Sequence, residues 1–446
     1  MLRRAGLLWY TRAMKNKPVT AIIVGAGHRS VLYAGLAHAR PDMLKITGVA
    51  DPNPLRREKV AREFSVGADM CFASAQELAK HPKLADAIIN GTMDHQHAET
   101  SIPLLERGYD MLLEKPFTVS EEEMRRIAEA AKKGGNKVMI CHVLRYAPFY
   151  AAIRKKLMEG AIGGVFNMQA AEHVSYHHMA VGYVRGKWNN TEKCRSGMLL
   201  AKCCHDMDLI MWMKTGVRPV SVSSFGSNYQ FTPEKRPENA GTRCLVDCPI
   251  ESGCAYSANK HHIENDWWGF YAWEGIEHLG DATREQRIES LKTGNPFGRC
   301  VWRCDNNVVD HQSVMVNFED GCTATLNMVG GCAKPDRTLH IIGTKGEISG
   351  SLESAKFTLR KVDPRPGGQQ YSEEVVDLNA AGDASGITGG HGGGDMRLVE
   401  DFVCHLRGEK PSISCTTLAD SINGHLAVFR AEKSRETGAT VLLGDF

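Results

Sequence analysis

Short apolar runs alternate with amphipathic segments along the first third of the chain. The segments between the runs, such as 97–107, repeat apolar residues at helical spacing, and Ser120 to Glu123 reads as a capping box at a helix start. Repeated strand–helix units predict a parallel, doubly wound α/β sheet over residues 14–145, with ligands at the carboxyl ends of its strands. The runs that predict strands are 19–24, 44–50, 85–90, 110–113 and 137–141.

The pattern changes after Pro148. Residues 151–159 predict a helix, and the following runs alternate apolar and polar residues with the period of two that is typical of half-buried strands. Apolar stripes over 395–436 predict C-terminal helices. We therefore expect a second α/β domain over 146–446, with a mainly antiparallel sheet and an insertion at 231–304. The predicted strands are 165–173, 220–225, 312–318, 322–329, 338–343, 347–351 and 356–361.

A glycine turn follows the first predicted strand and opens a helix. In Gly25-Ala-Gly27-His-Arg-Ser30, the first glycine permits a tight turn and the second lets the backbone approach a pyrophosphate. Ser30 takes the place of the third glycine and is small enough for close packing. Asp51 follows the second strand, where a carboxylate accepts the ribose hydroxyls of NAD; an Asp-Pro turn is the alternative. NAD is therefore the expected cofactor, and NADP the less favoured one.

Further polar residues follow the predicted strands, and the ends of parallel strands share one edge of a sheet. We expect this edge to bind the dinucleotide. Besides the glycine turn and Asp51, the predicted cofactor-binding residues are His28, Arg29, Ser30, Thr92, Asp94, His97, Glu114 and Lys115.

Four segments resemble the Gfo/Idh/MocA oxidoreductases: GAGHRS, GTMDHQHAE, LLEKPFTVS and SRETGATV. The resemblance extends over nearly the whole chain from about Met14, and the Glu-Lys-Pro after the fourth strand is its most specific mark. It implies a Rossmann domain, a C-terminal domain with a large open sheet, and NAD(P)-linked oxidation or reduction of sugar-like alcohols. It also implies homo-oligomers, dimers or tetramers, that pack through that sheet. Lys115 and His205 match the active-site lysine and histidine of the family.

The stretch LLAKCCHDMDLIMW contains His205 and reads as a helix. Alcohol oxidation by hydride transfer needs a base for the hydroxyl proton, which suits histidine, and a positive charge beside the developing alkoxide, which Lys115 can supply. Lys202 and Asp208 share the face of His205, and both are predicted to bind substrate. Many relatives carry an aspartate where this chain has Ala201. The alternative for His205 is a core histidine capped by Asp208, and the alternative for Lys115 is a surface lysine in a turn.

Two more residues are predicted to bind substrate. Arg145 matches a family position near cofactor and substrate, with a domain-junction salt bridge as the alternative. His391 lies in the glycine-rich GGHGGGD segment, which could approach a sugar pocket or merely turn the chain. The adjacent Cys203 and Cys204 lack the spacing of a metal or redox pair, so we expect packed thiols.

The insertion is rich in cysteine and tryptophan. Four thiolates, of Cys244, Cys248, Cys254 and Cys300, could bind a structural zinc ion that fastens this loop; free thiols or a disulfide are the alternative. The aromatic segment ENDWWGFYAWE could stack on sugar rings or form a local core or interface.

The composition is that of a globular protein. The chain has 446 residues, with 42% hydrophobic and 24% charged residues and a formal net charge of +2, which does not favour capture of nucleic acid or an anionic membrane. No apolar run is long enough to predict a transmembrane helix. Residues 1–13 read as an upstream extension, and a cytoplasmic location is expected.

These observations predict an NAD-dependent oxidoreductase that transfers hydride between nicotinamide and a secondary hydroxyl of a sugar, cyclic polyol or glycoside. Two alternatives stay open. One is a glycosidase that oxidises, eliminates and re-reduces its substrate with NAD recycled in place. The other is a non-catalytic NAD-bound sensor or scaffold.

Overall fold

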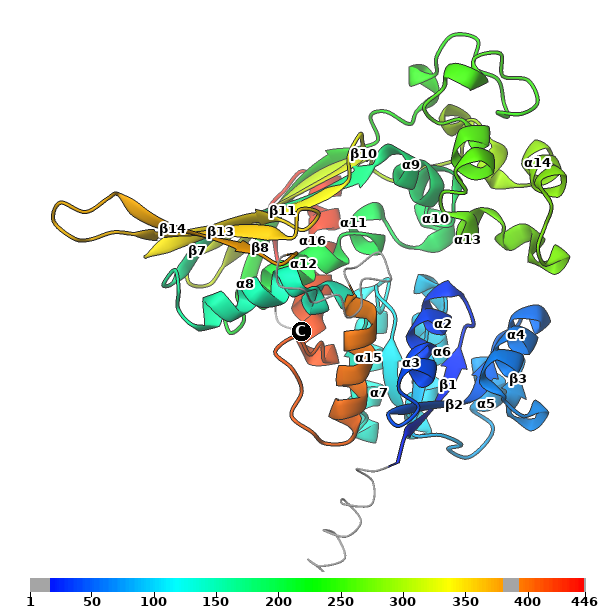
Figure 1. Ribbon diagram of the computed structural model, residues 1–446, viewed down its shortest axis with the longest axis horizontal. Coiled ribbons are helices and arrows are strands. Elements are labelled where there is room, and N and C mark those ends of the chain that lie inside the picture. The colour runs from blue at the N-terminus through cyan, green and yellow to red at the C-terminus, as the bar shows by residue number, and fades with distance from the viewer. Residues whose placement is uncertain (1–16, 380–392, 445–446) are drawn as a thin grey trace, which may run out of the picture. The chain divides into compact units, whose positions relative to one another are not determined.

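The computed structural model describes residues 17–379 and 393–444, which divide into two compact units (Figure 1). The first unit comprises the described residues up to Lys155 together with those of 378–423. The second comprises Lys156–Asp377 and the described residues from Gly424 onward. None of the described helices is both long and apolar enough to cross a membrane.

The first unit is built on a six-stranded sheet in the order β3-β2-β1-β4-β5-β6. Its strand pairs are parallel, and β1 lies between β2 and β4, which is the point where the strand order reverses. This confirms the predicted doubly wound sheet and adds the short strand β3. The strands are β1 (Val19–Val24), β2 (Leu44–Ala50), β3 (Cys71–Phe72), β4 (Ala87–Asn90), β5 (Asp110–Leu113) and β6 (Val138–Ile140).

Helices cover this sheet, and one of them comes from far along the chain. Helix α15 (Gly394–Leu406) packs against α2 and α3 (Figure 1), and its Leu398 and Phe402 join the apolar core formed by Ile23 and Leu36. The C-terminal part of the chain thus completes the first unit. The other helices are α2 (His28–Ala34), α3 (Leu36–Ala39), α4 (Pro54–Phe64), η1 (Ala68–Met70), α5 (Ala75–Leu78), η2 (Asp94–Gln96), α6 (His97–Glu106), α7 (Glu121–Gly134) and η3 (Val143–Tyr146). Helix α8 (Pro148–Met158) crosses the boundary between the two units.

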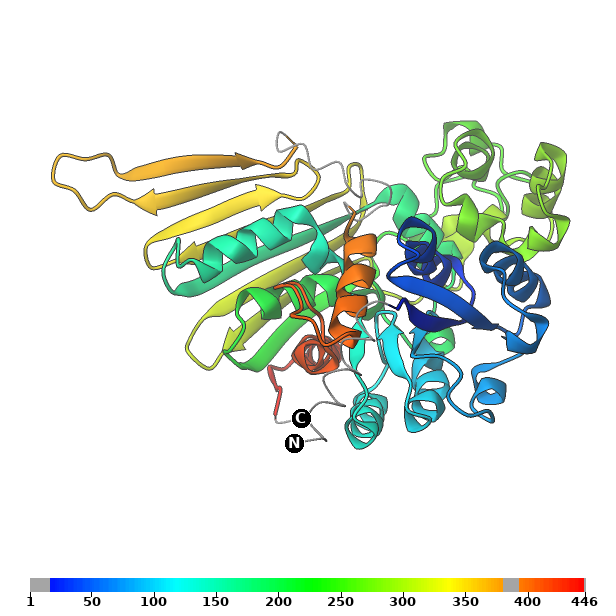
Figure 2. The same cartoon turned by 60° about the horizontal axis from the view of Figure 1, so that its bottom comes forward.

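A nine-stranded sheet in the order β14-β13-β12-β11-β7-β10-β9-β8-β15 forms the second unit. The pair β7–β10 is parallel and the other pairs are antiparallel, which confirms a mainly antiparallel sheet. Strands β13 and β14 form a hairpin at one edge (Figure 2). The strands are β7 (Val165–Ser175), β8 (Pro219–Ser227), β9 (His311–Phe318), β10 (Thr323–Cys332), β11 (Asp336–Gly343), β12 (Gly346–Ser351), β13 (Lys356–Val362), β14 (Tyr371–Asp377) and β15 (Val441–Leu442).

One face of this sheet carries the helix predicted from LLAKCCHDMDLIMW. Helix α12 (Cys204–Met213) is buried along its whole length and packs on β7 and β10. Helix α16 (Leu418–Thr437) passes so close at Gly424 that an added Cβ would lie 3.4 Å from the Cα of Asp208. Nearby short helices are α9 (Tyr176–Met179), α10 (Thr191–Cys194) and α11 (Met198–Ala201), and η4 (Ala180–Arg185) has π-helical hydrogen bonding.

The insertion between β8 and β9 has a small apolar core of its own. Val181, Ala258, Leu291 and Phe297 are buried in it, together with Cys244. Tryptophans of the aromatic segment pack against this core, so the segment contributes to a local core. The elements are η5 (Pro233–Lys235), η6 (Glu251–Gly253), η7 (Asn259–Glu264), α13 (Gly269–Ala272), η8 (Glu274–Leu279), α14 (Arg284–Lys292), η9 (Pro296–Gly298) and η10 (Val301–Arg303).

Candidate active site

The glycine turn after β1 fits a bound dinucleotide. Gly25 has φ +75°, and an added Cβ would lie 2.8 Å from the backbone nitrogen of Thr92, so a side chain is excluded there. An added Cβ at Gly27 would meet nothing within 4 Å, which leaves open space at the start of α2 for a phosphate. The hydroxyl of Ser30 donates to the carbonyl of Gly25 at 2.6 Å and holds the turn from inside.

Asp51 is buried at the end of β2. Its Oδ2 accepts the backbone N–H of Ala26 at 2.7 Å, and its Oδ1 accepts that of Asn53 at 2.7 Å. The carboxylate therefore joins the glycine turn to the loop after β2. Each oxygen retains a second lone pair, as a ribose contact requires.

Glu114 organises the loop after β5. Its Oε1 accepts hydrogen bonds from Arg29 Nε at 2.8 Å and the Tyr33 hydroxyl at 2.7 Å, and its Oε2 accepts the backbone N–H of Lys115 at 2.6 Å. Burial alone would raise the pKa of Glu114, but the charges of Arg29 and Lys115 and these hydrogen bonds hold it below its usual value. Glu114 is therefore an anion that fixes the backbone of Lys115.

Arg29 is committed to protein carboxylates on two sides. Besides Glu114, it reaches Asp395 of α15, where Nη2 and Oδ1 lie 2.6 Å apart. The C-terminal helix thus helps to position the loop that carries Lys115. His28, the neighbour of Arg29 in the glycine turn, is exposed at the start of α2.

His97 connects the loops that follow β4 and β5. Its Nδ1 lies 2.8 Å from the carbonyl of Pro116, and its Nε2 lies 3.1 Å from the carbonyl of Thr92. Burial lowers the pKa of His97, so the ring is neutral and donates one of these hydrogen bonds. Asp94 is buried beside it in η2, and the peptide bond between Lys115 and Pro116 is cis.

His142, which the sequence analysis did not select, lies among the cations of the first unit. It follows β6, and burial together with the charges of Arg145 and Lys115 lowers its pKa well below the usual value. The rule that selected Lys115, a polar residue just beyond a parallel strand, also applies to His142. Arg145 is buried and donates from Nη1 to the carbonyl of Cys415 at 3.2 Å, within the same unit.

In the second unit, a buried cluster of charges surrounds the start of α12. Lys202 Nζ lies 3.2 Å from Glu172 Oε1, and Arg337 Nε lies 2.6 Å from Glu172 Oε2 and 2.9 Å from Asp206 Oδ1. Arg337 faces Glu172 directly across the β11–β7 pairing. Two cations and two carboxylates therefore balance each other, and one of them, Asp206, is the residue next to His205.

Burial shapes the protonation of this cluster. It lowers the pKa of Lys202, while the Glu172 carboxylate opposes that shift. It raises the pKa of Asp206, although Arg337 pulls in the other direction. His205 and Asp208 are also buried, three residues apart on α12, and the cluster holds Lys202 on the side of β7.

The predicted site residues thus fall into two groups. The cofactor-binding residues, Lys115 and Arg145 lie in the first unit, whereas Lys202, His205 and Asp208 lie in the second. His391 lies outside the described residues. Sequence reasoning missed Glu172, Asp206 and Arg337; a charged residue at an inward position of a strand was the available signal for Glu172.

The structure does not support the predicted zinc site. Cys244, Cys248, Cys254 and Cys300 do line one cavity of about 10 Å³, and their thiols are free. However, within 17–379 and 393–444 no three or more His, Cys, Asp or Glu side chains are placed to hold a metal ion. Burial raises the pKa of the Cys254 thiol and brings that of Cys300 to about 11.

A positive charge already lies in that cavity. The buried guanidinium of Arg185 donates from Nη2 to Cys244 Sγ at 3.4 Å and to the carbonyl of Tyr256 at 2.8 Å. Cys244 also belongs to the apolar core of the insertion. Core packing and the hydrogen bonds of this arginine therefore contribute to holding the loop together.

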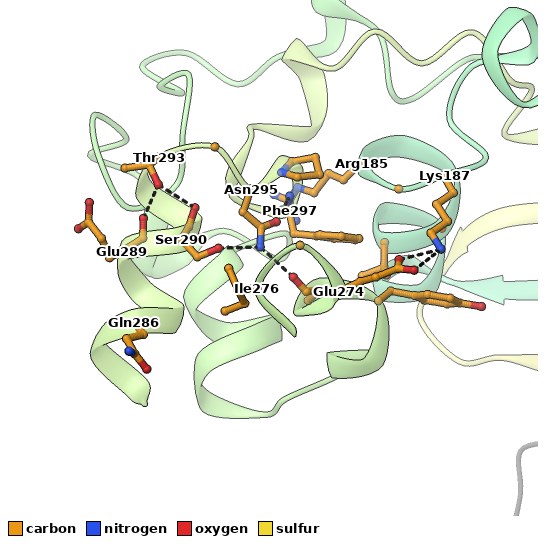
Figure 3. Close-up of a pocket in the computed structure, with 18 of the residues that line it drawn as sticks. Arg185, Lys187, Glu274, Ile276, Gln286, Glu289, Ser290, Thr293, Asn295 and Phe297 are labelled. Atoms are coloured by element: carbon orange, nitrogen blue, oxygen red, sulfur yellow. Dashed lines mark hydrogen bonds and ion pairs between the residues drawn. The ribbon is translucent and has the colours of Figure 1, made fainter. Parts of the chain in front are cut away.

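A much larger cavity, of about 800 Å³, lies in the same insertion (Figure 3). Its walls come from η4 and the residues after it, from the α13–η8 segment, and from α14 and η9. None of the predicted catalytic or cofactor-binding residues lines it.

A parallel sheet with a glycine turn, a carboxylate after β2 and a fixed lysine after β5 defines a dinucleotide-binding oxidoreductase. Residues 19–142 match the NAD-binding Rossmann fold of the Gfo/Idh/MocA oxidoreductase family, and residues 154–443 match its C-terminal alpha/beta domain. The chain therefore belongs to this family. The match confirms the predicted family, the oxidoreductase class and NAD as the cofactor.

Individual relatives are distant. YteT of Bacillus subtilis is 24% identical over 372 residues, which cover 80% of this chain and 82% of that protein. The scyllo-inositol 2-dehydrogenase (NAD(+)) of Bacillus subtilis is 29% identical over 145 residues, or 32% of this chain and 42% of that enzyme. Levoglucosan dehydrogenase, solved with NADH and levoglucosan, superposes with a TM-score of 0.68 at 17% identity, covering 96% of this chain and 100% of that one.

Proposed function

We propose that the protein is an NAD-dependent dehydrogenase that transfers hydride between nicotinamide and a secondary hydroxyl of a sugar or cyclic polyol. Support comes from the family match and from relatives that are named for inositol and levoglucosan. Neither the redox-recycling glycosidase nor the sensor is favoured by these comparisons. The observation that carries the proposal is the fixed loop of Lys115 at the carboxyl end of β5, where this fold binds its ligands.

Lys115 is the proposed electrostatic catalyst. Glu114 fixes its backbone, and the cis bond to Pro116 follows directly. A held ammonium group donates a hydrogen bond to the reacting oxygen and stabilises the negative charge that develops there as the C–H bond breaks. When bound, NAD accepts the hydride from the carbinol carbon.

His205 is the proposed general base for oxidation and the acid for reduction. In oxidation its imidazole takes the hydroxyl proton, and in reduction it returns that proton to the oxygen.

We propose that Lys202 and Asp208 bind neighbouring hydroxyls of the substrate. Arg145 of the first unit is proposed to bind substrate as well. Ala201 cannot supply the carboxylate that many relatives carry, whereas Lys202 offers up to three donors near His205. Its charge is balanced by Glu172, so a neutral, hydroxyl-rich substrate fits better than an anionic one.

The test is the substitution Lys115→Ala. We expect turnover to fall by about three orders of magnitude, since one preorganised electrostatic donor contributes about that much, while the Kd for NAD stays within a few fold. Conservative replacement by arginine should not restore the rate, because the guanidinium is wider and differently shaped. Turnover near the wild-type rate in Lys115→Ala would reject the assignment.

Four further proposals concern the whole chain. We propose a cytoplasmic enzyme, a homodimer or homotetramer that packs through the open sheet face, and a preference for NAD over NADP that is set by Asp51. The proposed domain division is 14–145 and 146–446, although α15 packs with the first unit.

A further inference from the structure

The cavity of about 800 Å³ in the insertion has the size of a small-molecule site. None of the residues that the proposed hydride transfer uses lines it, because all of its lining residues belong to 181–188 and 271–297. A cavity of this size inside a loop insertion is not required for packing, since protein interiors are otherwise close-packed.

Three of the residues that line the cavity are glycines. An added Cβ at Gly182 in η4 would meet its nearest atom at 3.8 Å, and at Gly275 or Gly294 it would meet nothing within 4 Å. None of the three has a positive φ, so no backbone strain requires glycine there. A leucine is therefore sterically tolerated at each position, and at the buried Gly182 its side chain would take up part of the cavity that this glycine lines.

Aromatic and aliphatic side chains make up much of the wall. The rings of Trp188 and Tyr271 meet edge to face with centroids 5.8 Å apart, and Phe297 closes the cavity from η9. Ile276 and Leu279 of η8 add aliphatic surface, and Figure 3 shows Ile276 near the middle of the lining residues. Such walls select a ring system that can stack or meet these rings at an edge.

The polar groups of the wall carry no formal net charge. The cations are Arg185 and Lys187 and the carboxylates are those of Glu274 and Glu289. Lys187 Nζ and Glu274 Oε2 pair at 2.7 Å, and the two side chains point toward each other in Figure 3. A charge-balanced wall favours a neutral ligand over a phosphate or a carboxylate.

Hydrogen-bonding positions accompany the apolar surface. The amide of Asn295 donates to the Ala272 carbonyl at 2.8 Å and to the Ser290 hydroxyl at 3.1 Å, which fixes Ser290 at the wall. The Ser290 hydroxyl and the two carboxylates are able to bond the hydroxyl groups of a ligand. Together with the aromatic wall, this pattern matches a hydroxylated ring.

We propose that this cavity is a second binding site, which takes a neutral, hydroxylated aromatic compound. Such a ring has two sources: it is the non-sugar part of a glycoside that the enzyme oxidises, or it is a separate effector. The first source rests on the proposed dehydrogenase function, whereas binding itself does not.

The test uses isothermal titration calorimetry of the full-length protein with salicyl alcohol, a neutral hydroxylated ring. Gly182→Leu fills the cavity from η4, and Gly275→Leu fills it from η8 in case the first variant does not fold. Gly253→Leu is the matched control, because an added Cβ there also meets nothing within 4 Å but lies outside this cavity. We expect the Kd to rise at least tenfold in a folded filling variant and to stay unchanged in Gly253→Leu.

Kinetics then separate the two sources. If the ring belongs to the substrate, salicin has a lower KM than methyl β-D-glucopyranoside, and cavity filling removes that difference. If it is an effector, free salicyl alcohol changes the rate on the methyl glycoside, and cavity filling removes that change.

Absence of NADH formation from every carbohydrate would reject the dehydrogenase but leave the calorimetric result standing. No heat of binding in the wild type, or equal Kd values in all variants, overturns the proposal.

Discussion

At the scale of single residues, a buried glutamate contacts each lysine of the proposed site: Glu114 accepts the backbone N–H of Lys115, and Glu172 pairs with the ammonium of Lys202. Each glutamate is itself bonded to an arginine. Glu114 pairs with Arg29, and Glu172 pairs with Arg337. The arginines stay charged at all relevant pH values, so each glutamate keeps a positive partner beside it. Removing one member of such a buried set leaves a charge without compensation, which is more damaging than removing the pair.

Lys202→Met tests this balance. It leaves Glu172 and Asp206 opposite Arg337 alone, so we expect the free energy of unfolding to fall by about 3 kcal/mol. Adding Glu172→Gln to Lys202→Met should restore part of the loss, because the excess negative charge is then gone. Urea unfolding of both single variants and the double variant gives the coupling energy. Strictly additive losses would show that the two side chains do not stabilise each other.

At the scale of elements, strand ends were the most readable feature of the sequence. Parallel strands end at a common edge, so the residues after β1, β2, β4 and β5 could be assigned to one site from the chain alone. The residues that surround Lys202 could not be assigned from the chain alone. The pairing of Glu172 with Arg337 depends on the register between β7 and β11, which are far apart in sequence. The association of Asp395 with Arg29 was hidden for the same reason.

The cysteines of the insertion show what motif spacing can and cannot predict. The sequence grouped these cysteines correctly, since all four line one cavity, but it did not show that Arg185, from outside the segment, lines the same cavity and bonds Cys244. Motif spacing predicts which residues of one segment come together, but it does not predict the side chains that other segments contribute.

The π-helical segment η7 gives a pH-dependent prediction. Burial lowers the pKa of both His261 and His262 to about 3, and the neutral rings donate to the carbonyls of Ala255 and Trp267 at 2.8 and 3.2 Å. In the unfolded chain these groups titrate near 6.5. Between about pH 3 and 6.5 the unfolded state therefore binds more protons than the folded one.

The free energy of unfolding should consequently decrease as the pH falls from 6.5, by at most about 1.4 kcal/mol per pH unit for each histidine. In the double variant His261→Gln and His262→Asn, which keeps an amide donor near each carbonyl, the decrease should be smaller. Denaturant titrations between pH 7 and 4 measure this difference. The same pH dependence in both proteins would contradict burial of neutral histidines.

At the scale of the whole molecule, the second unit presents a sheet face with exposed apolar side chains. Phe225 on β8 is 71% exposed and Met315 on β9 is 54% exposed. Met315 lies opposite Ser223, two residues before Phe225, so both side chains emerge on the same face. Exposed apolar groups on a paired sheet face are typical of a surface that another subunit covers.

Phe225→Asp with Met315→Asp should therefore convert the proposed homo-oligomer to monomers. Like charges brought together by the two-fold related copies of one patch disfavour the contact. Light scattering after size exclusion gives the mass, and Val362→Asp, exposed at the far hairpin, serves as control. A wild-type protein that is already monomeric at micromolar concentration would refute the proposed assembly.

The most direct measurement is formation of NADH by the purified protein across a panel of cyclic polyols, aldoses and glycosides, read by NADH fluorescence. The account predicts that at least one neutral, hydroxyl-rich compound is oxidised. It also predicts that the rate falls when the carbinol hydrogen is replaced by deuterium, and that Lys115→Ala and His205→Ala each lower the rate strongly. Protein that binds NAD in full yet forms no NADH from any member of the panel would contradict the dehydrogenase assignment.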